Sequence, residues 1–242
     1  MSAEPLPPPV ILAEVRIGRA VPYTRPGSRS GIAKLPQSAP VRVGVNGLEG
    51  DEQGDLRVHG GPDKAIHHYP FDHYADWQAE LGPHRLLQAA GAFGENFSAR
   101  GWTESDLCLG DVVSVGTALL EVSQGRQPCW KLSDRFAVAD MALRVQRSGR
   151  TGWYYRVLRP GVVSAGDCLA ILQRPYPAWS LQRLMAVLHD RRLEEALLRE
   201  CLSLPLVPSW QRLLQRRLEL RSAEDWSPRL DGPALEASAD GR

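Results

Sequence analysis

Apolar positions between residues 10 and 173 fall in short runs, some of them alternating with polar residues, and glycines separate the runs. Representative runs are Glu14–Gly18, Val41–Gly44, Asp111–Gly116 and Leu169–Leu172. Runs of this length between turn-forming residues are typical of β-strands, so the pattern predicts a mainly β body, built as a barrel or a sandwich. Two helices are expected to interrupt the strands, at 71–81 and 138–146, because apolar side chains recur there at helical spacing.

The pattern changes after Pro177, where the apolar residues follow helical spacing. Ser180 can cap the amino end of a helix that runs to Leu188, and further helices are expected over 193–201 and from Pro208. Three short helices scarcely bury a core of their own, so this segment should pack on the β body or on a partner subunit. We therefore divide the chain into a disordered lead (1–9), a β-rich domain (10–173), a three-helix domain (178–220) and a flexible tail (221–242).

The composition indicates which partners the protein does not bind and in which cell compartment it is expected. The 242 residues carry a formal net charge of +1, which provides no general attraction to nucleic acid or to an anionic membrane. The amino terminus has no basic region ahead of an apolar core, and no apolar stretch is long enough to span a bilayer. The 4 cysteines are scattered without a Cys-x-x-Cys pair, which argues against a disulfide framework and a structural zinc site. We expect a cytoplasmic protein that binds neither nucleic acid nor membranes.

One cysteine lies in a segment whose chemistry differs from that around the others. Cys129 follows Pro128, with Arg126 and Lys131 nearby, in the loop-like segment Ser123–Leu132. Neighbouring cations favour the thiolate, and a thiolate is either a nucleophile or a soft metal ligand. The alternative for any cysteine is a small core residue, and that interpretation suits three of them: Cys108, Cys168 and Cys201. The sequence has no Gly-x-Ser-x-Gly elbow that would indicate a serine nucleophile.

A second candidate segment, 47–69, is rich in glycine, histidine and charge. Gly60 and Gly61 would let backbone amides approach a ligand closely, as in sites that bind anions. Cationic donors stand around them: Arg57, His59 and Lys64. The alternative is a long surface loop, because the spacing matches neither a Walker A loop nor a dinucleotide fingerprint. Zinc binding by the histidines of this segment is disfavoured, since their spacing matches no helical zinc motif.

Taken together, these segments resemble MOSC-domain proteins, and specifically the YiiM-like group described as 6-hydroxylaminopurine reductases. The matching motifs, in order, are Gly47–Gln53, Val58–Ala65, Phe93–Asn96, Gly110–Asp111, Val122–Gln124, Arg126, Pro128–Cys129, Lys131–Leu132, Thr151–Trp153 and Pro160–Gly161. The resemblance covers about Glu14 to Leu172 and extends to the three helices. It implies a mainly β, barrel-like MOSC body with a few helices, a small C-terminal three-helix appendage and a pterin molybdenum cofactor. The chain departs from the family pattern around its cysteine at Gly125, Gln127 and Trp130.

The resemblance also implies roles for individual residues. Cys129 would be the protein thiolate on molybdenum and would take part in catalysis. His59 is a candidate catalytic proton donor, because imidazole titrates near neutrality. Candidates for holding the phosphate and pterin of the cofactor are Gly60, Gly61, Lys64, Arg126 and Lys131. Candidates for hydrogen bonds to pterin or substrate are Asn96 and Gln124, and candidates for stacking on a flat base are Trp130 and Trp153.

The expected activity is reduction of N-hydroxylated compounds, such as N-hydroxylated purine bases, by a molybdenum enzyme. The sequence has no dinucleotide fingerprint, iron–sulfur cysteine spacing or haem motif, so electrons are expected from a separate reductase. The helical appendage is a candidate surface for that partner or for homodimerisation. Two alternatives stay open: a cofactor carrier or sulfur-transfer module without turnover, which would share the same cysteine, and an interaction module that uses the helices alone.

Overall fold

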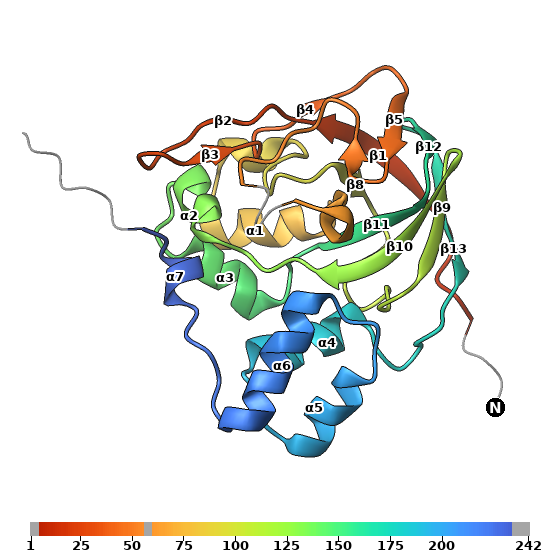
Figure 1. Ribbon diagram of the computed structural model, residues 1–242. Helices are drawn as coiled ribbons and strands as arrows, with labels where there is room; N and C mark the ends of the chain where they lie inside the picture. Colours follow the sequence, from red (N-terminus) through yellow and green to blue (C-terminus); the bar gives the residue numbers. More distant parts are fainter. Residues whose placement is uncertain (1–4, 56–59, 234–242) are drawn as a thin grey trace, which may run out of the picture.

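The computed structural model describes residues 5–55 and 60–233, and most of its strands form one closed barrel (Figure 1). The barrel strands are β1 (Val10–Ile17), β7 (Ile66–Pro70), β8 (Phe97–Ala99), β9 (Val112–Val115), β10 (Ala118–Gly125), β11 (Trp153–Arg159) and β13 (Cys168–Gln173). Their order in the sheet is β13-β9-β10-β11-β7-β8-β1, and an antiparallel pairing of β1 with β13 closes the ring. Only β7 and β8 pair in parallel among these neighbours. The predicted mainly β, barrel-like body is confirmed.

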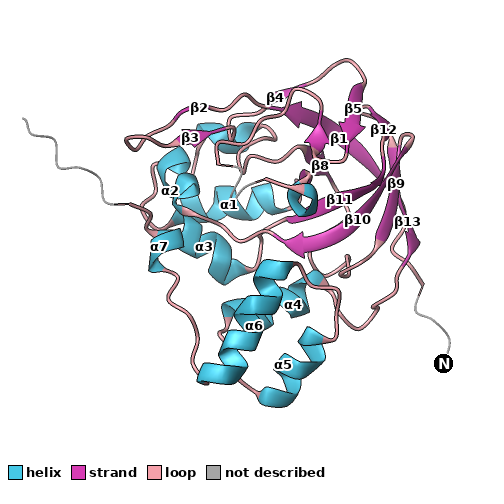
Figure 2. Ribbon diagram, viewed as in Figure 1, coloured by secondary structure: helices cyan, strands magenta, loops and turns pink. Residues whose placement is uncertain are grey.

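Short strands and helices surround the barrel (Figure 2). The short strands are β2 (Val21–Pro22), β3 (Arg29–Ser30), β4 (Leu35–Pro36), β5 (Val41–Gly44), β6 (Gly47–Leu48) and β12 (Gly161–Val163). The helical elements of the body are η1 (Pro62–Lys64), α1 (His73–Leu81), η2 (Arg85–Gln88), α2 (Trp130–Phe136) and α3 (Met141–Ser148). The two helices expected at 71–81 and 138–146 are confirmed as α1 and α3. Helix α2 was not expected, because it is only seven residues long and the preceding Pro128 marks a loop.

The interior of the barrel is filled by side chains that alternate along each strand, as a sheet with one buried face requires. On β9 and β10 these are Val113, Val115, Leu120 and Val122, and on β11 they are Trp153 and Tyr155. On β7, His68 is completely buried and its ring stacks on Trp153 with centroids 4.4 Å apart. Its Nδ1 lies 3.2 Å from the Tyr155 hydroxyl, while its Nε2 has no hydrogen-bond partner within the described ranges.

Replacing His68 with phenylalanine is expected to reduce the acid sensitivity of the fold. Burial lowers the pKa of His68 to about 3, below that of an unfolded histidine, so the unfolded state takes up the proton first as pH falls. This histidine therefore removes about 1.4 kcal/mol of unfolding free energy per pH unit between about pH 6.5 and 3. Urea unfolding at several pH values should show a shallower pH dependence in His68→Phe, with parallel curves above pH 7. Equal slopes in the two proteins below pH 6 would contradict the argument.

The C-terminal helices form a unit with its own core, as expected for the three-helix appendage. They are α4 (Leu181–His189), α5 (Glu195–Leu202) and α6 (Pro208–Leu220). Ser180 caps α4, because its side chain accepts a hydrogen bond from the Arg183 amide at 3.2 Å. The helical core includes Leu198, Trp210 and Leu214 and is continuous with Leu109 of the body. None of the described helices is long and apolar enough to cross a membrane.

The segment after α6 differs from the expected flexible tail. Residues 222–233, which we name the strap, contain a further short helix, α7 (Ser227–Leu230). Glu224 at its beginning pairs with the buried Arg217 of α6 at 2.8 Å. From there the chain runs back to α2 and α3 of the body (Figure 1). The sequence did not reveal these contacts, because few residues of the strap are apolar and the contacts are made by single side chains. Residues 234–242 lie outside the described part of the chain.

In the amino-terminal lead, the carbonyl oxygen of Pro8 accepts a hydrogen bond from the Trp102 indole at 2.9 Å.

Candidate functional site

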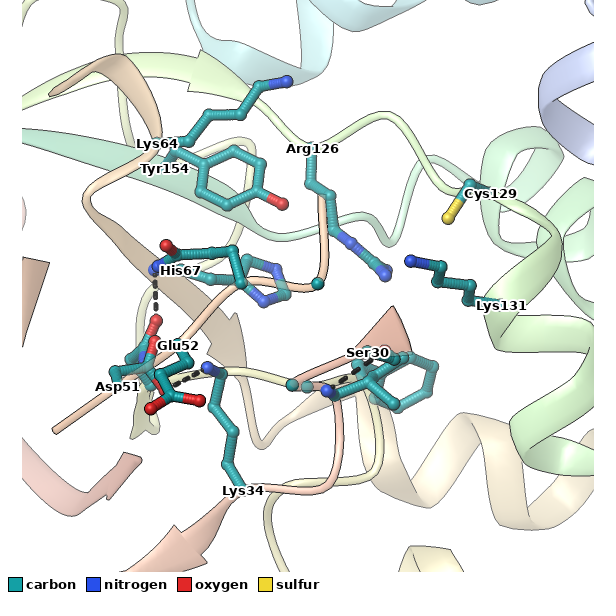
Figure 3. A pocket seen from close by; sticks show the side chains of 17 residues that line it. Ser30, Lys34, Asp51, Glu52, Lys64, His67, Arg126, Cys129, Lys131 and Tyr154 are labelled. Atoms are coloured by element: carbon teal, nitrogen blue, oxygen red, sulfur yellow. Dashed lines mark hydrogen bonds and ion pairs between the residues drawn. The ribbon is translucent and has the colours of Figure 1, made fainter. Parts of the chain in front are cut away.

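A cavity lies against the outer face of the barrel where β7, β10 and β11 meet (Figure 3). Segments that are far apart in the sequence surround it. They meet here because neighbouring strands of the barrel place their ends, and the loops that follow them, next to one another. The described lining residues are Ser30, Gly31, Ile32, Lys34, Asp51, Glu52, Gln53, Gly54, Lys64, His67, Phe93, Gly94, Asn96, Arg126, Cys129, Lys131 and Tyr154.

Strand alternation decides which aromatic side chains reach the cavity. Trp153 and Tyr155 point into the barrel, so Tyr154 between them points outward, and His67 does the same beside the inward-facing His68. The rings of Tyr154 and His67 lie 5.1 Å apart, centroid to centroid. Trp153 is fully buried in the core and is therefore not available to stack on a ligand.

Trp130, the other aromatic proposed for stacking, also differs from expectation. It is 9% exposed, lies under the guanidinium of Arg25 at 4.2 Å, and is not among the described residues that line the cavity. The aromatic ring that β11 contributes to the cavity, beside Phe93 and His67 of the same described lining, is thus that of Tyr154. Tyr154 and Trp153 are neighbours on β11, and the register of the strand decides which of them faces outward. The sequence alone did not fix that register.

Cys129 enters the cavity from the beginning of α2. Strand β10 ends at Gly125, the Arg126 amide donates to the Gly152 carbonyl at 2.9 Å, and Cys129 then occupies the N-cap position of the helix in an extended conformation. The side chain is half-buried. Figure 3 shows Cys129, Arg126 and Lys131 directed toward a common space. The end of a strand and the start of a helix therefore hold the thiol and two cations together.

Among the described residues, four cations line the cavity: Lys34, Lys64, Arg126 and Lys131. Burial lowers the pKa of Lys64, and the negative charges of Cys129 and Asp63 act in the opposite direction. Burial also raises the pKa of Tyr154, an effect that the neighbouring Arg126 guanidinium opposes. Cys129 thus shares the cavity with these cations, which places a soft sulfur donor beside groups that attract anions.

Two acidic residues of the lining are already engaged by cations. Asp51 pairs with Lys34, and both side chains are almost completely buried. Burial lowers the pKa of Lys34, and Asp51 opposes that change. Glu52 pairs with Arg19 at 2.6 Å on the surface side. The positive charges around Cys129 therefore outweigh the negative ones, which suits an anionic ligand such as a phosphate.

Two polar atoms of the lining are buried without a hydrogen-bond partner in the described ranges. They are Nη1 of Arg126 and Nε2 of His67. Unsatisfied buried polar atoms are costly, and a ligand group at this place would relieve the cost. A pterin molybdenum cofactor would supply phosphate and ring acceptors for Arg126, and Cys129 is the soft donor that molybdenum accepts. The residues of the cavity fit this group.

The structure brings together most of the candidates drawn from the sequence. Lys64, Asn96, Arg126, Cys129 and Lys131 all line the one cavity. His59 lies outside the described residues. Gly60 and Gly61 are described but are not among the lining residues, although Gly61 has a φ of 95° and leads into η1, which ends at Lys64. Gly61 therefore shapes the turn that presents Lys64, whose amide donates to the Gly61 carbonyl at 2.9 Å.

Two amide side chains have partners different from those expected. Asn96 Oδ1 accepts from the His67 amide at 3.0 Å, and its Nδ2 donates to the Arg16 carbonyl at 3.0 Å and to Asp51 at 2.9 Å. Both donor hydrogens are thus used in the wall of the cavity. Gln124 Nε2 donates to the Asp63 carbonyl at 3.2 Å, and Gln124 does not line the cavity in the described part of the chain. Each amide thus holds neighbouring backbone or side chains in place, and Asn96 also lines the cavity.

Sequence reasoning missed Lys34 and Tyr154 and considered His67 only for zinc. The glycines of the lining were the sequence feature that could have indicated these residues, because two backbone segments approach each other closely at such positions. A Cβ on Gly31 would lie 2.1 Å from the Glu52 carbonyl oxygen, and one on Gly94 would lie 2.6 Å from Ile32. Gly94 also has a φ of 77°. Within the described ranges, no three His, Cys, Asp or Glu side chains group in a way that could hold a metal ion.

Comparison with known proteins gives the same assignment for both parts of the chain. Residues 55–170 match the MOSC domain, and residues 179–221 match the YiiM-like 3-alpha helix domain. Protein YiiM of Escherichia coli strain K12 is 39% identical over 220 residues, which are 90% of this chain and 97% of that protein. A protein of Gibberella moniliformis named Reductase is 38% identical over 220 residues, and the match spans 39% of its length.

Solved structures agree with the sequence relatives. The crystal structure of YiiM from Escherichia coli has a TM-score of 0.78 and 34% identity, covering 93% of this chain and 99% of that one. The structure of YiiM from Geobacillus stearothermophilus has a TM-score of 0.74 and 33% identity, covering 86% and 99%. The body and the helical appendage of this chain therefore have the same overall arrangement as in these structures. The chain belongs to the YiiM-like family of MOSC-domain proteins.

Proposed function

We propose that this protein is a molybdenum-cofactor-dependent reductase of N-hydroxylated compounds, such as N-hydroxylated purine bases, which receives electrons from a separate reductase. The observation that carries the proposal is the half-buried Cys129 thiol among Lys64, Arg126 and Lys131 in one cavity. A redox role is supported by the name of the Gibberella moniliformis relative, which the chain matches over part of its length. The net reaction adds two electrons and two protons to R–NHOH and releases R–NH₂ and water.

The residues of the cavity would have different roles in such a reductase. A bound pterin molybdenum cofactor supplies two-electron redox chemistry. Cys129 offers the protein thiolate, and Arg126 offers an unpartnered N–H group to an anionic oxygen. Tyr154 offers the face of its ring to a flat base, and its hydroxyl stays protonated because burial raises its pKa. His59 stays a predicted proton donor, since it lies outside the described residues.

Metal analysis and a single-turnover assay test the proposal together. Protein made in a host that synthesises the cofactor should contain about one molybdenum per chain, held through the soft thiolate, and protein from a cofactor-deficient host should contain none. Dithionite-reduced protein should then be reoxidised by an N-hydroxylated purine, with formation of the amine. Bound molybdenum without reoxidation would favour a cofactor carrier or sulfur-transfer module. Folded protein without molybdenum from the competent host would overturn the proposal.

A further inference from the structure

The strap returns from the helical domain to the segment that carries Cys129. Arg229 of α7 donates to the carbonyl oxygen of Pro128, the residue directly before the cysteine. The other terminal nitrogen of the same guanidinium donates to Gln146 of α3 at 2.6 Å. The guanidinium also lies over the ring of Trp226 at 4.8 Å. One side chain thus connects the strap, the cysteine segment and α3.

Neighbours of Cys129 on both sides are in contact with the C-terminal part of the chain. A Cβ on Gly125 would lie 2.4 Å from the sulfur of Met185 on α4, so any larger residue would have to displace that side chain. Gln127 accepts a hydrogen bond from Trp210 of α6 at 3.3 Å. These two residues therefore join the cysteine segment to α4 and α6.

A second distant segment fastens the end of the strap. Arg25, in the turn between β2 and β3, donates to the carbonyl oxygens of Asp231 and Pro233 at 2.5 Å each. It also pairs with Asp134 of α2 at 3.0 Å and covers Trp130. A Cβ on Gly232 would lie 2.5 Å from the Trp130 ring, so the strap runs tightly over the residue that follows the cysteine.

We propose that the strap fixes the orientation of Cys129 in the cavity, and that Arg229 is the positioning residue through which it acts. The Pro128 carbonyl and the Cys129 amide share one rigid peptide plane, so holding that oxygen also holds the backbone from which the thiol projects. The proline ring already fixes φ of residue 128 and leaves its ψ to be set by this contact. The placement of the sulfur does not depend on which reaction the site performs, whereas its effect on turnover rests on the proposed function.

The charge of Arg229 agrees with this role. Burial lowers the pKa of its guanidinium to about 10, and the thiolate of Cys129 opposes the change. Arg229 therefore stays a cation at neutral pH, and its hydrogen bond to Pro128 is charge-assisted. Such bonds contribute more than neutral ones, so their loss should be measurable.

The test measures local order with Arg229→Gln, Arg229→Lys and a matched control, Arg199→Gln. Arg199 lies on α5, where it is exposed and pairs with Glu195 of the same helix. Hydrogen exchange of the peptide that spans 126–131 should be about tenfold faster in Arg229→Gln, because a charge-assisted hydrogen bond is lost. Exchange should equal that of the wild type in Arg199→Gln and be intermediate in Arg229→Lys, which restores the charge and one donor.

A second variant keeps the proposal testable if Arg229→Gln does not fold. Gly232→Ala leaves every charged group in place but pushes the strap away from Trp130, and Gly232 also has a φ of 70°. It should raise exchange at 126–131 in the same way. In cofactor-loaded protein, either change should lower kcat for the N-hydroxylated substrate and leave KM unchanged. Wild-type exchange at 126–131 in both folded variants would overturn the proposal, whether or not the protein reduces N-hydroxylated compounds.

Discussion

Replacing Cys129 with serine is expected to lower both the molybdenum content and the reductase activity by more than about a hundredfold. The reason is that changes to groups that only orient a metal ligand already cost about 10–100-fold. Serine keeps the size of the side chain but offers a hard hydroxyl with a much higher pKa, so the anionic sulfur is lost while the cations remain. Molybdenum per chain, measured on purified protein from a cofactor-competent host, gives the first result, and amine formation gives the second.

Cys168→Ser is the matched control for this experiment. Cys168 is exposed on β13, away from the cavity, and should retain full molybdenum content and activity. Similar thermal unfolding of the two serine variants would show that neither change disturbs the fold. If Cys129→Ser kept its molybdenum and its turnover, the thiol would not be a ligand. If it kept molybdenum but lost turnover, the cations of the cavity would hold the cofactor and the thiol would tune it.

The sequence predicted the elements whose signals are periodic and local. The predicted runs that lie in β1, β9 and β13, together with α1, α3 and the three helices of the appendage, carry spacing that follows from one buried face. The barrel strands β7, β8 and β11 were not among the predicted runs. Helix α2 has seven residues, too few for its spacing to be distinguished from a loop. The strap has almost no apolar residues, and its anchors are single side chains such as Arg229, whose partners lie about a hundred residues away. Contacts of that separation leave no periodic trace in a sequence.

The candidate site was predicted in part for a similar reason. Cys129, Arg126 and Lys131 lie within six residues of one another, so their shared chemistry could be seen in the sequence. Lys34 reaches the same cavity through a loop that crosses the barrel, and its neighbours in the chain give no sign of this. Tyr154 and Trp153 differ by one position, and only the register of β11 decides which of them faces outward. The type of a residue thus indicated what chemistry it could perform, but only its neighbours in the fold determined whether it lines the cavity.

Three neighbours of Cys129 in the chain have a common physical setting. Gly125 makes room for Met185, Gln127 accepts from Trp210, and Trp130 lies under the strap. All of these partners come from the chain after residue 180. The cysteine segment and the helical appendage therefore form one packed unit, in which a change on one side requires an adjustment on the other. This gives the appendage a role within the chain in addition to any docking or dimerisation surface that it offers.

Asp51→Ala is expected to destabilise the fold by about 3–5 kcal/mol, because it leaves a buried lysine without its counter-ion. The Asp51 side chain is 2% exposed and that of Lys34 is 7% exposed. The same carboxylate accepts from the Gly18 amide at 2.8 Å and from Asn96 at 2.9 Å, so three groups lose an acceptor together. Urea unfolding should show a lower midpoint with an unchanged slope.

Two further variants separate the buried charge from the lost hydrogen bonds. Asp140→Ala removes an exposed carboxylate that pairs with Arg144 on the surface, and it should leave the urea midpoint almost unchanged. Lys34→Met in the Asp51→Ala background removes the unpaired cation and should recover part of the lost stability, since an apolar side chain of similar length fits the same space. A cost for Asp51→Ala as small as that for Asp140→Ala would mean that water reaches Lys34 and that the wall of the cavity is open. Recovery in the double variant would instead show that this ion pair keeps the wall dry, and that the cations around Cys129 act in a medium where their charges are felt strongly.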